Sequence, residues 1–220
     1  MPAPSGMMRE NRSLNGRATL RQRLFAALLA RGSATHDRYV AGRKRALLGD
    51  LHGDLLEIGA GAGPNLAYLP GDVRYVAVEP NPAMDRYLRD AAARAGLALE
   101  IRRGRAEALP APDASADAVI STLVLCSVGD VAAALREIRR VLRPGGRLVF
   151  LEHVAAPPGS RTRRWQDAIR PLWQLAADGC QPNRDTAAAL EQAGFAALEI
   201  ERFTVPVPIV GPHIAGVALR

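Results

Sequence analysis

The sequence predicts an α/β fold in which a mostly parallel sheet carries helices on both faces. The first observation is a short apolar run, Leu55–Ile58, followed by three glycines at alternate positions, Gly59, Gly61 and Gly63. The second is that further apolar runs of strand length alternate with segments that have the spacing of amphipathic helices. The third is that turn residues separate these segments. A strand, a glycine-rich turn and a helix form the first unit of a doubly wound sheet, and repeated β-α alternation is typical of that architecture.

The spacing of the glycines distinguishes between classes of ligand. A dinucleotide fingerprint needs its third glycine three places after the second. Here the third glycine is Gly63, two places on, and the position that a dinucleotide site requires is Pro64. An acid, Glu57, lies two residues before the first glycine. A nicotinamide oxidoreductase is therefore disfavoured.

The composition limits the classes of protein to which the chain can belong. With 220 residues, 48% of them hydrophobic, the chain can form one domain with a sizeable core, and disorder throughout is excluded. The formal net charge of +7 permits contact with nucleic acid or an anionic membrane. Arg supplies nearly all the positive charge, without basic stripes interleaved with aromatic residues, so we interpret it as a compositional bias. No apolar run approaches the roughly 18 residues of a membrane span.

The two cysteines, Cys126 and Cys180, are too few for a disulfide framework. Neither belongs to a C-x-x-C pair or has a histidine at metal-ligand spacing, so we expect no metal site. A reducing, cytoplasmic setting is the simplest interpretation.

The first 50 residues are expected to lie apart from the main domain, which spans residues 51–220. Residues 1–15 lack any hydrophobic period and predict a loose tail. Residues 19–30 and 35–48 have apolar residues at helical spacing and predict two helices. Three roles are open for these helices: a lid over the active site, packing on the sheet edge, or contact with a membrane surface through an apolar face bordered by Arg.

An acidic residue follows the second predicted strand, residues 74–78. Glu79 lies about 20 positions after the first glycine, the spacing expected for the acid that accepts the hydroxyls of a bound ribose. Asn81 is placed to cap a helix over residues 82–95, whose first residue is a proline. An ordinary exposed acid at a strand end is the alternative.

The rest of the chain continues the alternation. Helices are predicted over residues 131–142 and 186–192, and Arg143-Pro144-Gly145-Gly146 ends the first of them. Residues 157–183 predict a helix broken at Pro171. Strands are predicted over residues 99–102, 118–121, 147–152, 198–203 and 209–219.

Two strings carry a resemblance to a known family. The pattern E-x-G-x-G-x-G, from Glu57 to Gly63, resembles motif I of the class I S-adenosylmethionine-dependent methyltransferases. The string V-L-R-P-G-G-R-L-V-F, from Val141 to Phe150, resembles their post-I region. Two such strings in the correct order and at the correct distance indicate a methyltransferase type 11 domain. The resemblance implies a Rossmann-like sheet of seven strands with an antiparallel last strand, and an N-terminal helical lid.

The resemblance also implies S-adenosylmethionine as the methyl donor and S-adenosylhomocysteine as the product. The donor has no phosphate, so its site does not need a long phosphate cradle but needs room for a sulfonium, an amino-acid tail and a ribose. In the family the turn after the third strand contacts adenine, although here Arg105 stands where many relatives have an acid. The residues expected to bind the donor are Glu57, Gly59, Ala60, Gly61, Gly63, Asn65, Glu79, Pro80, Asn81, Ala106, Glu107, Thr122 and Leu123.

Further strings are similar to the alkyl thiol S-methyltransferase branch of the methyltransferase-like proteins. They are T-L-V-L-C-S-V at residues 122–128, L-E-H-V-A-A at 151–156, D-G-C at 178–180, and the run 205–216. Members of that branch begin with a hydrophobic anchor, whereas this chain has a polar tail, so only peripheral membrane contact stays open. The resemblance implies an acceptor site with three candidate catalytic residues, His153, Asp178 and Cys180. The structural alternatives are a histidine bonded to backbone, a turn, and a small buried cysteine.

We therefore expect direct transfer of a methyl group to a small-molecule acceptor, with a thiol as the first choice. The alternative acceptors are a lipid amine, a quinone or phenol, or a natural product, methylated on nitrogen, oxygen or carbon. A module that binds the donor without turnover is an alternative of another class. A nucleic-acid substrate is not expected, because no Asn-Pro-Pro-Tyr-like motif follows the fourth predicted strand. The sequence leaves the oligomeric state open.

Overall fold

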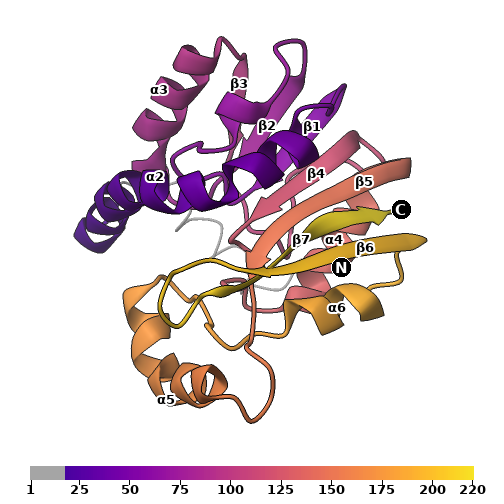
Figure 1. The fold of residues 1–220 in the computed structure, drawn as a ribbon. Helices are drawn as coiled ribbons and strands as arrows, with labels where there is room; N and C mark the ends of the chain where they lie inside the picture. Colours follow the sequence, from indigo (N-terminus) through magenta and orange to yellow (C-terminus); the bar gives the residue numbers. More distant parts are fainter. Residues whose placement is uncertain (1–17) are drawn as a thin grey trace, which may run out of the picture.

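A computed structural model describes residues 18–220 and shows a twisted sheet with helices on both faces (Figure 1). In this part of the chain the sheet has seven strands in the order β3-β2-β1-β4-β5-β7-β6. Strand β7 runs antiparallel to its neighbours β5 and β6, and the other neighbours pair in parallel. The α/β class, the seven strands and the antiparallel last strand are as the sequence predicts. The predicted tail, residues 1–15, lies outside the described residues.

The strands and helices follow the predicted order. The strands are β1 (Asp54–Ile58), β2 (Arg74–Val78), β3 (Leu99–Arg102), β4 (Ala116–Thr122), β5 (Leu142–His153), β6 (Ala197–Thr204) and β7 (Pro212–Leu219). The helices are α2 (Leu20–Leu48), α3 (Asp85–Ala95), α4 (Val131–Val141), α5 (Arg161–Ala176) and α6 (Thr186–Gln192), with 3-10 turns η1 (Leu66–Tyr68) and η2 (Pro82–Met84).

Alternate residues of the central strands point to opposite faces of the sheet, and a separate apolar cluster covers each face. In β1, Leu56 belongs to the cluster that contains α4 and α6, whereas Leu55 belongs to the cluster that contains α3. The same division separates Leu148 from Val149 in β5. A one-residue slip would exchange the two faces of a strand, so this packing fixes the register and the point at which each strand ends.

Residues Leu20–Leu48 form one continuous helix, α2, so the prediction of two separate helices was wrong. Thr19 begins the helix with a capping box, in which its hydroxyl accepts from the Gln22 N–H and the Gln22 side chain accepts from the Thr19 N–H. Gly32 in the middle costs about 1 kcal/mol relative to alanine. Contacts with the rest of the protein on both sides of Gly32 outweigh that cost.

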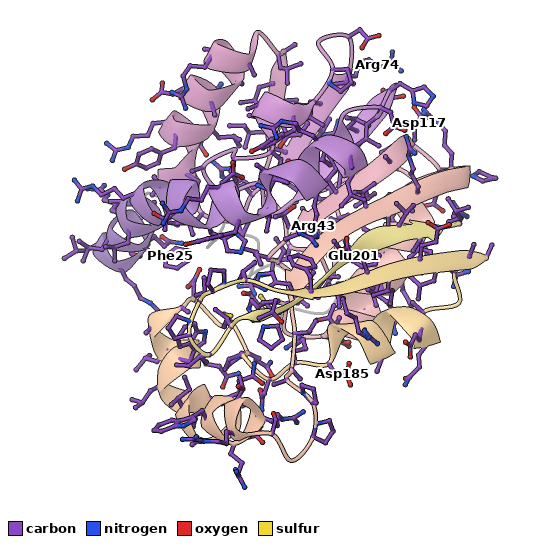
Figure 2. The ribbon with its side chains drawn as sticks, viewed as in Figure 1. Phe25, Arg43, Arg74, Asp117, Asp185 and Glu201 are labelled. Atoms are coloured by element: carbon purple, nitrogen blue, oxygen red, sulfur yellow. The ribbon has the colours of Figure 1, made fainter. Side chains whose placement is uncertain are left out.

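Polar contacts fix the C-terminal half of α2 against the sheet. The buried Lys44 ammonium lies 2.6 Å from the Asp37 carboxylate, which also accepts a 2.5 Å hydrogen bond from the Tyr68 hydroxyl. Figure 2 shows Arg43 on α2 beside Glu201 on β6, and their charged groups are 2.6 Å apart. These contacts join α2 to the loop after β1 and to the edge strand, so the helix lies across the sheet (Figure 1).

Two other helix predictions differ from the structure. Helix α5 continues through Pro171 instead of breaking there. Proline removes the N–H that would bond to the carbonyl of Asp167, but both residues are exposed, so water can satisfy that carbonyl. The helix expected after the glycines is only the turn η1, because Pro70-Gly71 follows it closely.

Among the strands, the bounds of β5 and β7 differ most from the prediction. Strand β7 begins at Pro212 rather than at Ile209, whose φ of 70° does not fit an extended strand. Strand β5 begins at Leu142, which pairs with Ala116 of β4. The register shifts before the next pair, Ala118 with Arg147, so the predicted turn over residues 143–146 is an irregularity within the strand.

We expect Leu148→Ala to lower the free energy of unfolding by about 2–5 kcal/mol, the range for truncating a fully buried leucine. Leu219→Ala is the matched control, because Leu219 lies in the neighbouring strand β7 with 40% of its surface exposed. The control should lose less than half as much stability in urea unfolding. Equal losses in the two variants would contradict this assignment of the core.

Candidate active site

The three glycines form the turn at the carboxyl end of β1. Gly59, Gly61 and Gly63 have φ angles of 56°, 55° and 75°, a region that residues with a side chain rarely adopt. A Cβ on Gly63 would lie 2.8 and 2.9 Å from two leucine side chains of the core. A Cβ on Gly61 would instead meet Leu29 of α2 at 3.5 Å. Gly63 therefore allows close packing, whereas Gly61 presents bare backbone toward α2.

Glu79, at the end of β2, binds the glycine turn through its carboxylate. One oxygen accepts a 2.9 Å hydrogen bond from the Gly61 N–H, and the other accepts a 2.8 Å bond from the Asn81 N–H. The side chain is only 5% exposed, and burial raises the pKa of Glu79. Asn81 caps η2, as predicted, by accepting from the Ala83 N–H. Each carboxylate oxygen keeps a lone pair for a further donor, such as a ribose hydroxyl.

A buried polar network lies beneath the turn. Glu57 accepts a 2.9 Å hydrogen bond from the Asn65 amide and a 2.5 Å bond from the Tyr75 hydroxyl. The same amide nitrogen donates to the Thr122 hydroxyl at 2.9 Å, which joins β1 to β4. Burial raises the pKa of Glu57 to about 7. The Asn65 Oδ1 atom is buried without a partner among the described residues, so it is available to a donor group of a ligand.

The remaining predicted donor residues lie at the same edge of the sheet. Pro80 and Leu123 are partly buried beyond β2 and β4, and Ala60 and Ala106 are buried beyond β1 and β3. Glu107 was expected beside adenine, and here its carboxylate accepts a 2.7 Å hydrogen bond from the N–H of residue 129, in the loop before α4. The predicted donor residues thus gather at the carboxyl ends of β1 to β4, where open α/β sheets bind ligands.

The N-terminal half of α2 covers this edge of the sheet. The Gln22 carbonyl accepts a 3.2 Å hydrogen bond from the Asn81 amide, next to the carboxylate of Glu79. About two turns farther along the helix, Leu29 lies over Gly61. A helix in this position fits the predicted lid, and its movement stays a prediction.

Two histidines join the middle of α2 to strand β7. His36 Nε2 lies 3.0 Å from His213 Nε2, and the two rings are stacked. His213 Nδ1 lies 2.9 Å from the carbonyl of Gly211, so Nδ1 carries the proton, Nε2 accepts, and His36 is the donor. Burial lowers the pKa of both rings, for His213 to about 4.

Beside the donor edge, a second group of side chains contains two of the three predicted catalytic residues. His153 Nε2 at the end of β5 lies 3.0 Å from Cys180 Sγ. That sulfur also lies 3.8 Å from Cys126 Sγ and accepts a 3.3 Å hydrogen bond from the Trp173 indole. The contacts with Cys126 and His153 and the hydrogen bond from Trp173 lower the pKa of Cys180. The contact with Cys180 and burial raise the pKa of Cys126.

Asp178, the third predicted catalytic residue, lies apart from this group. Its carboxylate is 3.6 Å from the Arg21 guanidinium of α2, and both side chains are more than half exposed. The structure therefore brings His153 and Cys180 together but leaves Asp178 at the surface, so its catalytic role stays a prediction without a supporting contact.

Sequence reasoning did not single out Glu152, which lies one residue before His153. Its buried carboxylate accepts hydrogen bonds from the Ser121 hydroxyl at 2.6 Å and the Val124 N–H at 3.1 Å, and burial raises its pKa. Its second oxygen has no partner among the described residues. The signal was present, because Glu152 is an acid within an apolar strand, as Glu57 is in β1. The position of Cys126 beside Cys180 had no such local signal in the sequence.

Comparison with known proteins identifies the family to which this arrangement belongs. A sequence family described as a methyltransferase domain matches residues 56–150. The human thiol S-methyltransferase TMT1A is 35% identical over 209 residues, which cover 89% of this chain and 86% of TMT1A. The chain belongs to the class I S-adenosylmethionine-dependent methyltransferases. S-adenosylmethionine is therefore its methyl donor, and Gly61, Glu79 and the unpartnered Asn65 oxygen fit that molecule.

Other relatives of this methyltransferase match it over different lengths. Human thiol S-methyltransferase TMT1B is 37% identical over 212 residues, covering 89% of this chain and 86% of TMT1B. The ubiquinone/menaquinone biosynthesis C-methyltransferase UbiE of Caulobacter vibrioides is 35% identical over only 118 residues, 46% of this chain and 47% of UbiE.

Solved structures agree on the fold. The [4+2]-cyclase SpnF superposes with a TM-score of 0.66 at 20% identity over 84% of this chain and 80% of SpnF. YcgJ of Bacillus subtilis superposes with a TM-score of 0.65 at 19% identity over 84% of this chain and 96% of YcgJ. At this level of identity the two structures support the Rossmann-like sheet alone. No helix within residues 18–220 of the methyltransferase is long and apolar enough to cross a membrane.

We expect Gly61→Val to abolish donor binding measured by calorimetry. A β-branched side chain is strained at a φ of 55° and would fill the space where the backbone is bare. Gly71→Val is the matched control, because a Cβ there meets no atom within 4 Å. Circular dichroism should show both variants folded, and wild-type affinity in Gly61→Val would refute the placement of the donor.

Glu79→Ala should weaken donor binding by roughly 1–3 kcal/mol, the range for leaving a buried hydrogen-bonding group without its partner. Glu100→Ala is the control for charge alone, because Glu100 is an exposed acid on the neighbouring strand β3. An equal loss of calorimetric affinity in both variants would indicate a general charge effect and contradict the assigned role of Glu79.

Proposed function

We propose that this methyltransferase transfers a methyl group from S-adenosylmethionine to the sulfur of a small-molecule thiol. The observation that carries the proposal is the extent of similarity. The two human thiol S-methyltransferases each match 89% of the chain, including the acceptor side, whereas the quinone C-methyltransferase of Caulobacter vibrioides matches 46%. A resemblance restricted to the donor half says little about the acceptor.

The chemistry needs little assistance beyond positioning. S-adenosylmethionine supplies a methyl group that is already activated by the positive sulfonium. The acceptor loses its proton, a new carbon–sulfur bond forms in line as the old one breaks, and S-adenosylhomocysteine leaves as a neutral thioether. A thiol with a pKa of about 8.5 loses its proton far more readily than an alcohol or an amine of ordinary pKa.

The residues of this chain divide these tasks between two places. Gly61 and Glu79 orient the donor, and Leu29 of α2 lies over the same backbone, where it excludes water. His153 and Cys180 are themselves buried polar side chains, 3.0 Å apart, and we propose that they bind the acceptor thiol.

The cysteine pair also bears on where the reaction takes place. Cys126 and Cys180 are both free, with their sulfurs 3.8 Å apart. A reducing compartment keeps such a pair from oxidising, which favours the cytoplasm as the site of the reaction.

The experiment compares acceptors that differ in one atom. The protein is incubated with methyl-labelled S-adenosylmethionine and either hexanethiol, hexanol or hexylamine, with a phenol and a quinol as further acceptors. We expect label in hexanethiol alone, and a reduced rate in Glu79→Ala at subsaturating donor. Transfer to the phenol or quinol instead of the thiol would overturn the proposal. Donor binding without transfer to any acceptor would indicate a binding module.

A further inference from the structure

Three potential metal ligands from distant parts of the chain meet in one buried place. Cys126 lies in the loop after β4, His153 at the end of β5, and Cys180 in the loop after α5. Their ligand atoms all lie within 4.8 Å of one another, and none of the three residues is more than 8% exposed. The sequence argument against a metal considered only local spacing, which does not detect ligands that the fold brings together.

The distances are close to those of a tetrahedral zinc site. Bonds of about 2.3 Å to sulfur and about 2.0 Å to nitrogen place two sulfur ligands about 3.8 Å apart and sulfur and nitrogen about 3.5 Å apart. The two sulfurs here are 3.8 Å apart, and His153 Nε2 is 3.0 Å from Cys180 Sγ. A metal ion would therefore require the imidazole to move away from Cys180 Sγ, and the ligand atoms of Cys126 and His153 already lie within 4.8 Å of each other.

The surroundings of the three side chains suit a cation. Two thiolates and a neutral imidazole are soft ligands that select zinc over magnesium or calcium, and two thiolates neutralise its double charge. The Trp173 indole N–H donates to Cys180 Sγ, as outer hydrogen bonds to metal ligands do. The Gln181 N–H donates to the Cys126 carbonyl at 2.9 Å, so the two cysteine loops are fixed to each other.

A second observation also points to a bound ligand. His153 Nδ1 and Glu152 Oε2 are buried without partners among the described residues. Buried polar atoms are almost always satisfied, so these two atoms indicate a water or a polar group of the acceptor beside the cluster, whereas the metal would bind Nε2, the ring nitrogen that faces Cys180.

We propose that Cys126, His153 and Cys180 bind one zinc ion and leave its fourth coordination position open to the thiol acceptor. Three protein ligands with an open position are typical of catalytic zinc, and a thiol that binds zinc loses its proton outright. The acceptor proton would pass to water as the zinc–sulfur bond forms. The thiolate would then form a bond to the methyl carbon as the bond from that carbon to the donor sulfonium breaks, so that S-adenosylhomocysteine leaves and the product is a thioether that zinc holds weakly. The second step rests on the proposed function, whereas zinc binding does not.

The place of the cluster supports this assignment. The side chain of Val124, two residues before Cys126, packs against Gly59, since a Cβ on that glycine would lie 2.7 Å from it. The loop that carries one ligand therefore contacts the glycine turn of the donor site.

The test measures metal binding directly in tag-free protein kept reduced. After zinc loading and removal of free metal, we expect one zinc ion per chain. Replacing zinc by cobalt should give thiolate-to-metal charge-transfer absorption, and adding hexanethiol should change the cobalt spectrum. Cys126→Ser, Cys180→Ser and His153→Gln should each weaken zinc binding by more than about 100-fold, and Trp173→Phe by about 10-fold, the range for outer partners. His52→Gln, at an exposed histidine, is the matched control and should bind zinc as the wild type does.

The outcomes separate this inference from the proposed function. Reduced wild-type protein that retains no zinc, gives no thiolate–cobalt absorption, or methylates hexanethiol at full rate without metal would overturn the inference and leave the function standing. Zinc binding without methylation of any thiol would contradict the function and leave the metal site standing. The wild-type cobalt spectrum tests metal binding even if a ligand variant fails to fold. A Cys126–Cys180 disulfide that excludes metal under reducing conditions would count against the inference.

Discussion

The donor edge of the sheet depends on one buried hydrogen bond, from the Gly61 N–H to the Glu79 carboxylate. A buried carboxylate is costly unless donors surround it, so this bond holds the glycine turn against the end of β2. The turn needs this support, because each glycine that is fixed in it loses more backbone entropy on folding than any other residue would lose. The donor therefore binds a preorganised surface. Helix α2 packs against Gly61 from the outer side.

Features with a local signal could be predicted from the sequence. Apolar runs and turn residues located the strands, since strands of a parallel sheet are buried on both faces and bounded by sharp turns. The dipeptide Gly63-Pro64 distinguished a site for S-adenosylmethionine from a site for a dinucleotide. Glu79 and the Asn81 cap followed from their positions at the end of a strand. The fold and the cap depend on neighbours in sequence, and these two predictions agree with the structure, which also gathers the residues predicted to bind the donor at one edge of the sheet.

Features created by tertiary packing could not be predicted in the same way. The continuity of α2 depends on contacts such as that of Asp37 with Tyr68, which outweigh the local cost of Gly32. Cys126 and Cys180 are 54 positions apart, and His36 and His213 are 177 apart, so no spacing rule connects them. Asp178 shows the reverse case, because it is close to Cys180 in sequence but its side chain lies beside Arg21 instead.

The unbroken α2 also restricts the order of events during turnover. Leu29 lies over the donor turn and His36 binds the β7 strand, and the two residues are two turns apart on one stiff helix, about 10 Å along its axis. If α2 moves as the predicted lid, its stiffness couples the two contacts, and lifting Leu29 from the donor turn also loads the contact of His36 with β7. On that prediction, release of spent donor and rearrangement beside β7 are linked events rather than independent ones.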